Sequence, residues 1–129
     1  MAPENKIRVG RYLIYGLLDP ETQELRYIGK THKRREWRLA EHITLAKEGD
    51  SRPVYEWIRE LLRRNLSPSI FVLRRIPPDR NWRKAEQEEI NRWKSLDEYV
   101  FPVHYPPQTP KSSMVVIKGV KLLNVTKGG

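Results

Sequence analysis

The stretch YLIYGLLDPETQELRYIG, residues 12–29, constrains the fold more than any other part of the sequence. Two runs rich in apolar residues and tyrosine flank DPETQ, whose Asp and Pro suit a turn. We therefore predict a β-hairpin of two strands, 11–18 and 24–28. If DPETQ is the whole loop, Tyr15 lies directly opposite Tyr27 on one face of the sheet. The two tyrosines then either form a simple cross-strand pair or belong to a functional site.

The hairpin is followed by a segment with the apolar spacing of a helix. We predict that this helix starts at Thr31, which can cap it, and runs to about Glu48. Gly49 can end it because glycine tolerates the left-handed backbone. Arg38 and His42 are four residues apart, which places both on one face, at the flank of the buried stripe. The helix thus brings a cation and an imidazole to the edge of the core.

The same reasoning predicts a second helix over 53–65, a third strand over 69–76 and a third helix over 81–96. The third helix contains an anomaly, because Glu86 and Glu89 fall within its apolar stripe. Carboxylates on a buried face are costly unless they are paired or bind a cation. These two residues therefore need either a charged partner or a bound cation.

Length and composition fit a single folded domain. The chain has 129 residues, of which 38% are hydrophobic and 32% charged, and domains usually hold about 100–200 residues. It has no run of the ~18 apolar residues that a membrane helix needs, no signal-peptide pattern and no cysteine. We expect a soluble cytoplasmic protein with no membrane partner. Residues 1–10 are expected to be a flexible N-terminus, and 11–129 the domain, with a proline-rich insertion at about 97–121.

The charge balance favours a polyanionic partner. Lys and Arg number 25 against 16 acidic residues, which gives a net charge of +9. Nucleic acid is the leading partner for such a surface, although many small proteins carry excess lysine for solubility. The decision therefore depends on local chemistry.

Five residues have side chains of the types that phosphodiester cleavage uses: a proton acceptor, positive charge on the phosphate and a carboxylate for Mg²⁺. They are Tyr15, Tyr27, Arg38, His42 and Glu86. LIY at 13–15 and YIG at 27–29 resemble the two halves of the GIY-YIG nuclease motif. Members of that family follow YIG with a helix that carries Arg and His four residues apart, as in REWRLAEHI here. A later helix carries a metal-binding Glu four residues before an aliphatic residue, as in WRKAEQEEI.

The family domain commonly closes with an Asn, here Asn124 in LLNVTKGG, which either touches the substrate or holds the site's shape through backbone hydrogen bonds. The chain departs from the pattern at two positions. Leu13 stands where the family name has Gly, and Glu89 occupies an aromatic position beside the catalytic Glu. Glu89 could be a second metal ligand, raise a neighbouring carboxylate's pKa or pair with an arginine.

The resemblance implies an α/β (α+β) fold with a small, mainly antiparallel three-stranded sheet flanked by helices. It also implies a DNA endonuclease that uses one Mg²⁺ or Mn²⁺ ion and leaves 5′-phosphate and 3′-hydroxyl ends. Its catalytic residues would be Tyr15, Tyr27, Arg38, His42, Glu86 and Asn124.

The resemblance also assigns roles within this set. Glu86 binds the metal, and Tyr15, hydrogen-bonded toward His42, accepts the proton of the attacking water or passes it onward. A phenol has an ordinary pKa of about 10, so it needs nearby positive charge for this task, which Arg38 could supply. Arg38 and Tyr27 also hold the phosphate. The metal stabilises the departing 3′ oxygen.

Two other functions stay open. One is a nucleic-acid-binding module that keeps the fold but has lost turnover because Glu89 spoils the metal site. The other is a structural protein of a phage or mobile element, which leaves the five-residue constellation unexplained. For a nuclease we expect a bacterial, phage or mobile-element setting, with target choice left to a separate DNA-targeting domain or protein, or to the insertion at 97–121. The sequence does not indicate the oligomeric state.

Overall fold

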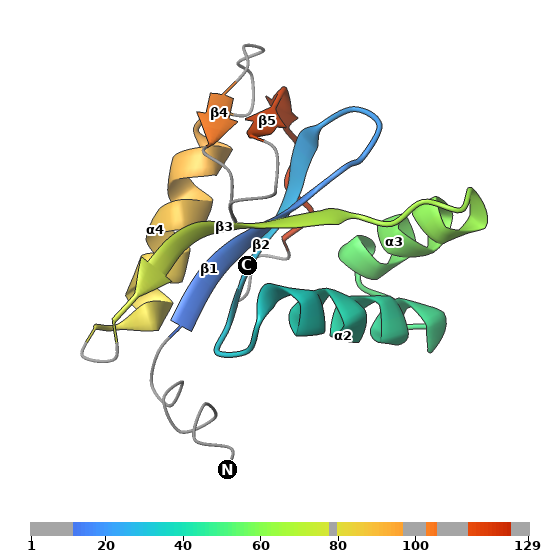
Figure 1. Ribbon diagram of the computed structural model, residues 1–129, viewed down its shortest axis with the longest axis horizontal. Helices are drawn as coiled ribbons and strands as arrows, with labels where there is room; N and C mark the ends of the chain where they lie inside the picture. Colours follow the sequence, from blue (N-terminus) through green and yellow to red (C-terminus); the bar gives the residue numbers. More distant parts are fainter. Residues whose placement is uncertain (1–11, 78–79, 97–102, 106–113, 125–129) are drawn as a thin grey trace.

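The computed structural model describes residues 12–77, 80–96, 103–105 and 114–124. These residues form an α+β fold with a mixed four-stranded sheet in the order β3-β1-β2-β6 and a separate pair, β4-β5 (Figure 1). The strands are β1 (Tyr12–Leu18), β2 (Glu24–Thr31), β3 (Ser69–Ile76), β4 (Val103–Tyr105), β5 (Val115–Ile117) and β6 (Gly119–Val120). The helices described are α2 (Arg35–Lys47), α3 (Pro53–Arg63) and α4 (Trp82–Lys94).

The main sheet has one strand more than the three expected. β1 pairs with β2 and β3 in antiparallel orientation, as predicted, and β6 pairs with β2 in parallel orientation through Glu24–Gly119 and Leu25–Val120. A parallel partner from the far end of the chain needs a long connection. A strand of two residues is also too short for its apolar spacing to show which strand it pairs with. The prediction of a three-stranded sheet was therefore wrong, because β6 adds a fourth strand at the edge.

The hairpin is confirmed, but the predicted register is wrong. Leu18 pairs with Leu25, whereas Leu17 pairs with Tyr27, so Arg26 has no counterpart on β1 and forms a bulge. The turn is one residue longer than DPETQ, because Leu18 pairs with Leu25 and not with Glu24, and the bulge shifts the remaining pairs by one residue more. Tyr15 therefore lies opposite Gly29 instead of Tyr27. The two tyrosines still share a face as diagonal neighbours, with ring centroids 6.4 Å apart.

The glycine of the YIG segment has a packing role. A Cβ atom at Gly29 would lie 2.4 Å from the Tyr15 hydroxyl oxygen and 2.6 Å from its Cζ atom. Both atoms belong to a buried ring that cannot retreat. Gly29 is therefore the residue that lets the Tyr15 ring lie flat across β2.

The first predicted helix begins later than expected. Thr31 is the last residue of β2, and its hydroxyl accepts a hydrogen bond from the Lys33 amide instead of capping a helix. α2 starts at Arg35, and Gly49 follows it with φ of 93°, as the sequence indicated. The other elements agree more closely, because β3 has the predicted bounds and Asn81 caps α4 by accepting hydrogen bonds from two amides of its first turn.

The helices cover both faces of the sheet (Figure 1). α4 packs on the face that carries Ile14, Ile28 and Phe71, where Trp93 is almost wholly buried. α2 and α3 pack on the opposite face, against Tyr15 and Leu17. Alternate residues of β1 thus serve two different cores.

Parts of the sequence predictions lie outside the described residues. They are the flexible N-terminus at 1–10 and most of the insertion at 97–121, from which only β4, β5, β6 and a few neighbouring residues are described. Among the helices described, none is both long and apolar enough to cross a membrane.

Candidate active site

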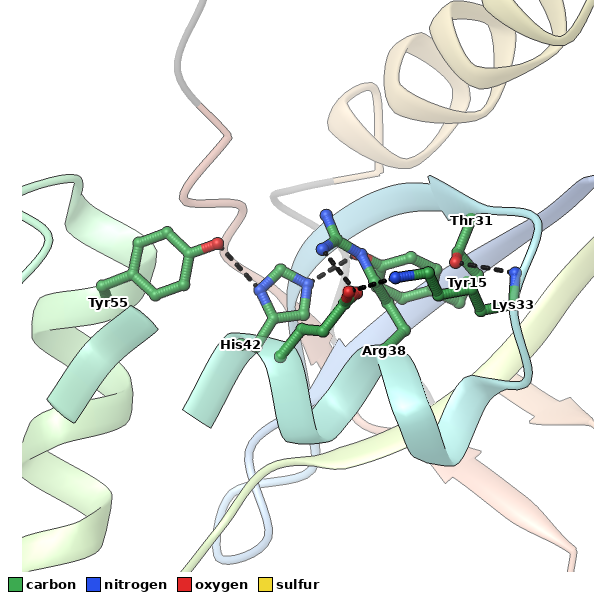
Figure 2. Close-up of polar contacts among 7 residues, drawn as sticks. Tyr15, Thr31, Lys33, Arg38, His42 and Tyr55 are labelled. Atoms are coloured by element: carbon green, nitrogen blue, oxygen red, sulfur yellow. Dashed lines mark hydrogen bonds and ion pairs between the residues drawn. The ribbon is translucent and has the colours of Figure 1, made fainter. Parts of the chain in front are cut away.

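A chain of hydrogen bonds runs through the core between the sheet and α2 and α3 (Figure 2). The Tyr15 hydroxyl lies 2.6 Å from His42 Nε2, and His42 Nδ1 lies 3.0 Å from the Tyr55 hydroxyl. Arg38 Nε donates to the Tyr15 oxygen at 3.0 Å. The chain is satisfied when Tyr15 donates its own proton to Nε2, which leaves Nδ1–H to donate to Tyr55.

Burial sets the protonation of this chain. Tyr15 and His42 are both 0% exposed. Burial, and to a lesser degree Tyr27, raise the pKa of Tyr15, while Arg38 opposes the shift. Burial and then Arg38 lower the pKa of His42 to about 3. Both groups are therefore neutral at physiological pH. His42 is also more deeply buried than the predicted position at the edge of the core.

Arg38 links this buried chain to the surface. Its NH1 group donates to Glu41 Oε1 at 3.2 Å, and Lys33 also pairs with Glu41. Arg38 and Glu41 line a groove of about 480 Å³ along α2, beside Trp37, whose side chain is 65% exposed. The guanidinium is thus held between a buried phenol and an open groove that a substrate can enter.

Tyr27 is half-buried next to the same imidazole, with its ring centroid 5.5 Å from that of His42. Burial and the neighbouring Tyr55 raise the pKa of Tyr27, so its hydroxyl keeps its proton and can donate a hydrogen bond. Four of the six predicted site residues, Tyr15, Tyr27, Arg38 and His42, therefore lie together.

Glu86 approaches this group from α4. It is half-buried, and with the other described residues it forms no hydrogen bond or ion pair. Burial raises its pKa, while the positive charges of Lys30 and Arg38 lower it. Its charge in turn raises the pKa of Tyr27. Glu86 is thus near Lys30, Arg38 and Tyr27 and has a free carboxylate.

The contacts of Glu89 distinguish between the three roles that the sequence left open for it. It is 6% exposed, accepts a hydrogen bond from Trp93 Nε1 at 3.2 Å and forms an ion pair with Arg74 at 3.6 Å. Of the three roles considered, pairing with an arginine is the one observed.

Asn124 acts on the backbone of β2. Its side-chain amide donates to the Ile28 carbonyl at 2.7 Å, and its side-chain oxygen accepts from the Ile28 amide at 3.0 Å. The two bonds fasten the segment after β6 to the strand that carries Tyr27 and Gly29. Asn124 therefore holds the site's shape, which was one of its two expected roles.

Two residues at the site were not among the residues predicted for it. Tyr55 fixes the second nitrogen of His42, and its position three residues before the buried Ile58 was the signal that it faces inward. Lys30 lies over the Trp82 ring, with Nζ 4.1 Å from the centroid, and contributes charge to Glu86. Apolar spacing carries no signal that Lys30 would lie over Trp82, because the two residues are on different elements.

The donor set can be compared with what a hard cation requires. Mg²⁺ keeps several waters and is commonly held by one or two carboxylates together with substrate phosphates. One free carboxylate, that of Glu86, fits this requirement. Within the described residues, no group of three or more His, Asp and Glu side chains gathers to form an all-protein cage.

Comparisons with protein-family models, with curated proteins and with solved structures find no match to this chain.

Proposed function

We propose that the protein is a metal-dependent DNA endonuclease of the GIY-YIG type, which hydrolyses phosphodiester bonds to 5′-phosphate and 3′-hydroxyl ends. The observation that carries the proposal is Glu86: a half-buried carboxylate beside Arg38 and Tyr27 that has no hydrogen bond or ion pair within the described part of the chain. Keeping such a group without a partner costs stability, which favours a role in binding a cation. The net charge of +9 is consistent with a nucleic-acid substrate.

In this proposal Arg38 and Tyr27 hold the scissile phosphate. The guanidinium can form two hydrogen bonds to a phosphate, and the Tyr27 hydroxyl can donate a third. Glu86 would hold one Mg²⁺ or Mn²⁺ ion, which, when bound, stabilises negative charge on the departing 3′ oxygen. These residues lie on three different elements, β2, α2 and α4, that meet at one end of the sheet.

Proton transfer involves the buried chain. The attacking water gives its proton to the Tyr15 oxygen while Tyr15 passes its own proton to His42, and Tyr55 accepts from the imidazolium that forms. Since Tyr15 is 0% exposed and covered by Arg38, substrate must first draw the guanidinium away from the phenol toward the phosphate. The phosphate's negative charge then favours a charged His42, against the burial that disfavours it.

The alternative function, a binding module without turnover, was attributed to Glu89 spoiling the metal site. Glu89 is held by Trp93 and Arg74, so its carboxylate is not free to disturb a metal bound at Glu86. We therefore rank the nuclease first, in a cytoplasmic setting of bacterial, phage or mobile-element origin. Target choice is assigned to a separate DNA-targeting domain or protein.

A plasmid-nicking assay tests the proposal. Wild-type protein should nick supercoiled DNA with Mg²⁺ and stop when EDTA removes the metal. Arg38→Ala and Glu86→Ala should each lower the nicking rate by about 10²–10³-fold, since each removes charge stabilisation of the transition state. Arg63→Ala, on the exposed side of α3, is the matched control and should stay within about twofold of wild type. Equal nicking by all four proteins would identify a contaminant and reject the proposal.

A further inference from the structure

A second cavity lies away from Glu86, between the end of β3 and the beginning of α4. Its volume is about 540 Å³. Four cationic side chains line it, against one carboxylate, that of Glu88: they are Arg74, Arg75, Arg80 and Lys84. A hollow with this charge balance concentrates anions.

Most of this positive charge has no acidic partner among the residues that the structure describes. Arg74 pairs with Glu88 and Glu89. Arg75, Arg80 and Lys84 form no ion pair with any other described residue. The first amides of α4 are already occupied by the Asn81 side chain, so the attraction comes from side chains and not from the helix end.

The position of the cavity relative to Glu86 is fixed by strand pairing. Ile14 on β1 pairs with Arg74 on one side and with Lys30 on the other. Arg74 and Lys30 are therefore two strand spacings apart, about 10 Å. α4 lies over β1 between them, with Glu86 on the flank toward Lys30 and Glu88 on the flank toward Arg74.

Both places lie at the same end of the molecule. Figure 1 shows the end of β3 and the beginning of α4 beside the start of β1 and the turn that joins β2 to α2. On a DNA duplex each strand rises about 3.4 Å per nucleotide. The Arg74–Lys30 separation of ~10 Å corresponds to about three nucleotides along one strand. A backbone whose scissile phosphate lies beside Glu86, on the Lys30 flank of α4, can therefore reach the cavity on the Arg74 flank within a few nucleotides.

We propose that this cavity is a second phosphate site, which holds a DNA backbone phosphate a few nucleotides from the bond that is cut. Arg80 and Lys84 are its principal ligands, and the phosphate displaces the solvent that now screens them. The inference rests on the nuclease proposal. It adds a positioning contact that fixes the register of the duplex over Arg38 and Glu86 and carries no sequence information.

Salt-dependent binding tests the site independently of cleavage. Affinity for a fluorescent duplex is measured by anisotropy in EDTA over a range of NaCl concentrations. Each phosphate contact contributes about 0.9 to the slope of log K against log salt concentration. Arg80→Ala/Lys84→Ala should therefore lower the slope by about 1–2 and weaken binding at least about tenfold at moderate salt.

The control removes the same charge elsewhere. Arg63→Ala/Arg64→Ala deletes two cations from the exposed side of α3, where they pair with Glu60 and Glu21, and should change the slope by less than about 0.5. Arg80→Lys/Lys84→Arg keeps both charges and should bind as wild type does. Equal slopes in the two alanine variants would overturn the second site and leave the nuclease proposal intact. A wild-type protein that binds no DNA at low salt would reject both proposals.

A single neutral linkage locates the contact. In duplexes with one methylphosphonate at successive positions, one position a few nucleotides from the cut should weaken wild-type binding about as much as the alanine pair does. The same linkage should have little effect on Arg80→Ala/Lys84→Ala, because the partner is already absent. If no position behaves in this way, the cavity does not hold a phosphate.

Discussion

The two faces of the sheet bury polar groups in different ways. On the face covered by α2 and α3, Tyr15, His42 and Tyr55 form a continuous chain in which both imidazole nitrogens have a partner. On the face covered by α4, Glu89 is tied to Trp93 and Arg74, whereas Glu86 has no hydrogen bond or ion pair with the other described residues. Partnered groups specify the fold, and the unpartnered carboxylate is available to a ligand.

The largest expected effect concerns the partnered chain under acid. His42 has a pKa of about 3 in the folded protein against an ordinary value of 6.5, so the unfolded chain binds its proton first as pH falls. The stability that comes from neutral His42 is complete above pH 6.5 and is lost toward pH 3. The loss is about 1 kcal/mol per pH unit between pH 6.5 and 5, and about 4 kcal/mol over the whole interval.

Urea unfolding at several pH values measures this slope. Wild type should lose stability between pH 6.5 and 5, and His42→Gln should lose about 1 kcal/mol per pH unit less, even though it starts from a lower stability. The slope and not the absolute stability is compared, because Gln also changes the packing. Parallel curves would show that His42 is charged in the folded protein.

The next effect separates the two glutamates of α4. Glu89→Ala leaves the Trp93 indole N–H and Arg74 without their acceptor and should cost about 1–3 kcal/mol of unfolding free energy. Glu86→Ala removes no described contact and should stay within about 0.5 kcal/mol of wild type. Both changes in unfolding free energy are to be measured by urea unfolding at pH 7. Equal costs would contradict the distinction between a satisfied and a free carboxylate.

The smallest effect is the pH dependence of Glu86 itself. Burial raises its pKa in the folded protein, so its ionisation opposes folding, and stability is lost as pH rises through the folded pKa. Glu86→Gln should therefore be slightly more stable than wild type at pH 7, by less than about 1 kcal/mol, with the advantage gone near pH 4. The difference in stability between Glu86→Gln and wild type is measured by thermal melting at several pH values in low-salt buffer. An advantage that grows toward acid would reverse the assigned direction.

The sequence predicted local structure better than pairing. The bounds of β3 and the beginning of α4 follow from residues close together in the chain. Arg26, at the bulge, lies over the Trp57 ring and donates a hydrogen bond to the Lys121 carbonyl. Strand β6 likewise pairs with β2 from nearly one hundred positions further along the chain. Such partners leave no mark on apolar spacing. The register of Tyr15 was wrong by two residues, one from this bulge and one from a turn that is one residue longer than DPETQ.

The candidate site shows the same division. The four-residue spacing of Arg38 and His42 placed both next to Tyr15, as helix geometry requires. That spacing could not show how deeply His42 is buried, since burial depends on α3 packing across it. Periodicity flagged Glu86 and Glu89 together, and only the position of Arg74 on a neighbouring strand separates the paired residue from the free one.

Counting bound Mn²⁺ by electron paramagnetic resonance, in the presence of a DNA duplex, tests the central claim most directly. Wild type and Glu89→Gln should each bind one ion per chain with similar affinity. Glu86→Gln should bind it at least about tenfold more weakly, because a neutral amide replaces the anionic ligand. Unchanged binding by Glu86→Gln, or loss of the ion in Glu89→Gln, would contradict the assignment of Glu86 as the metal-binding carboxylate.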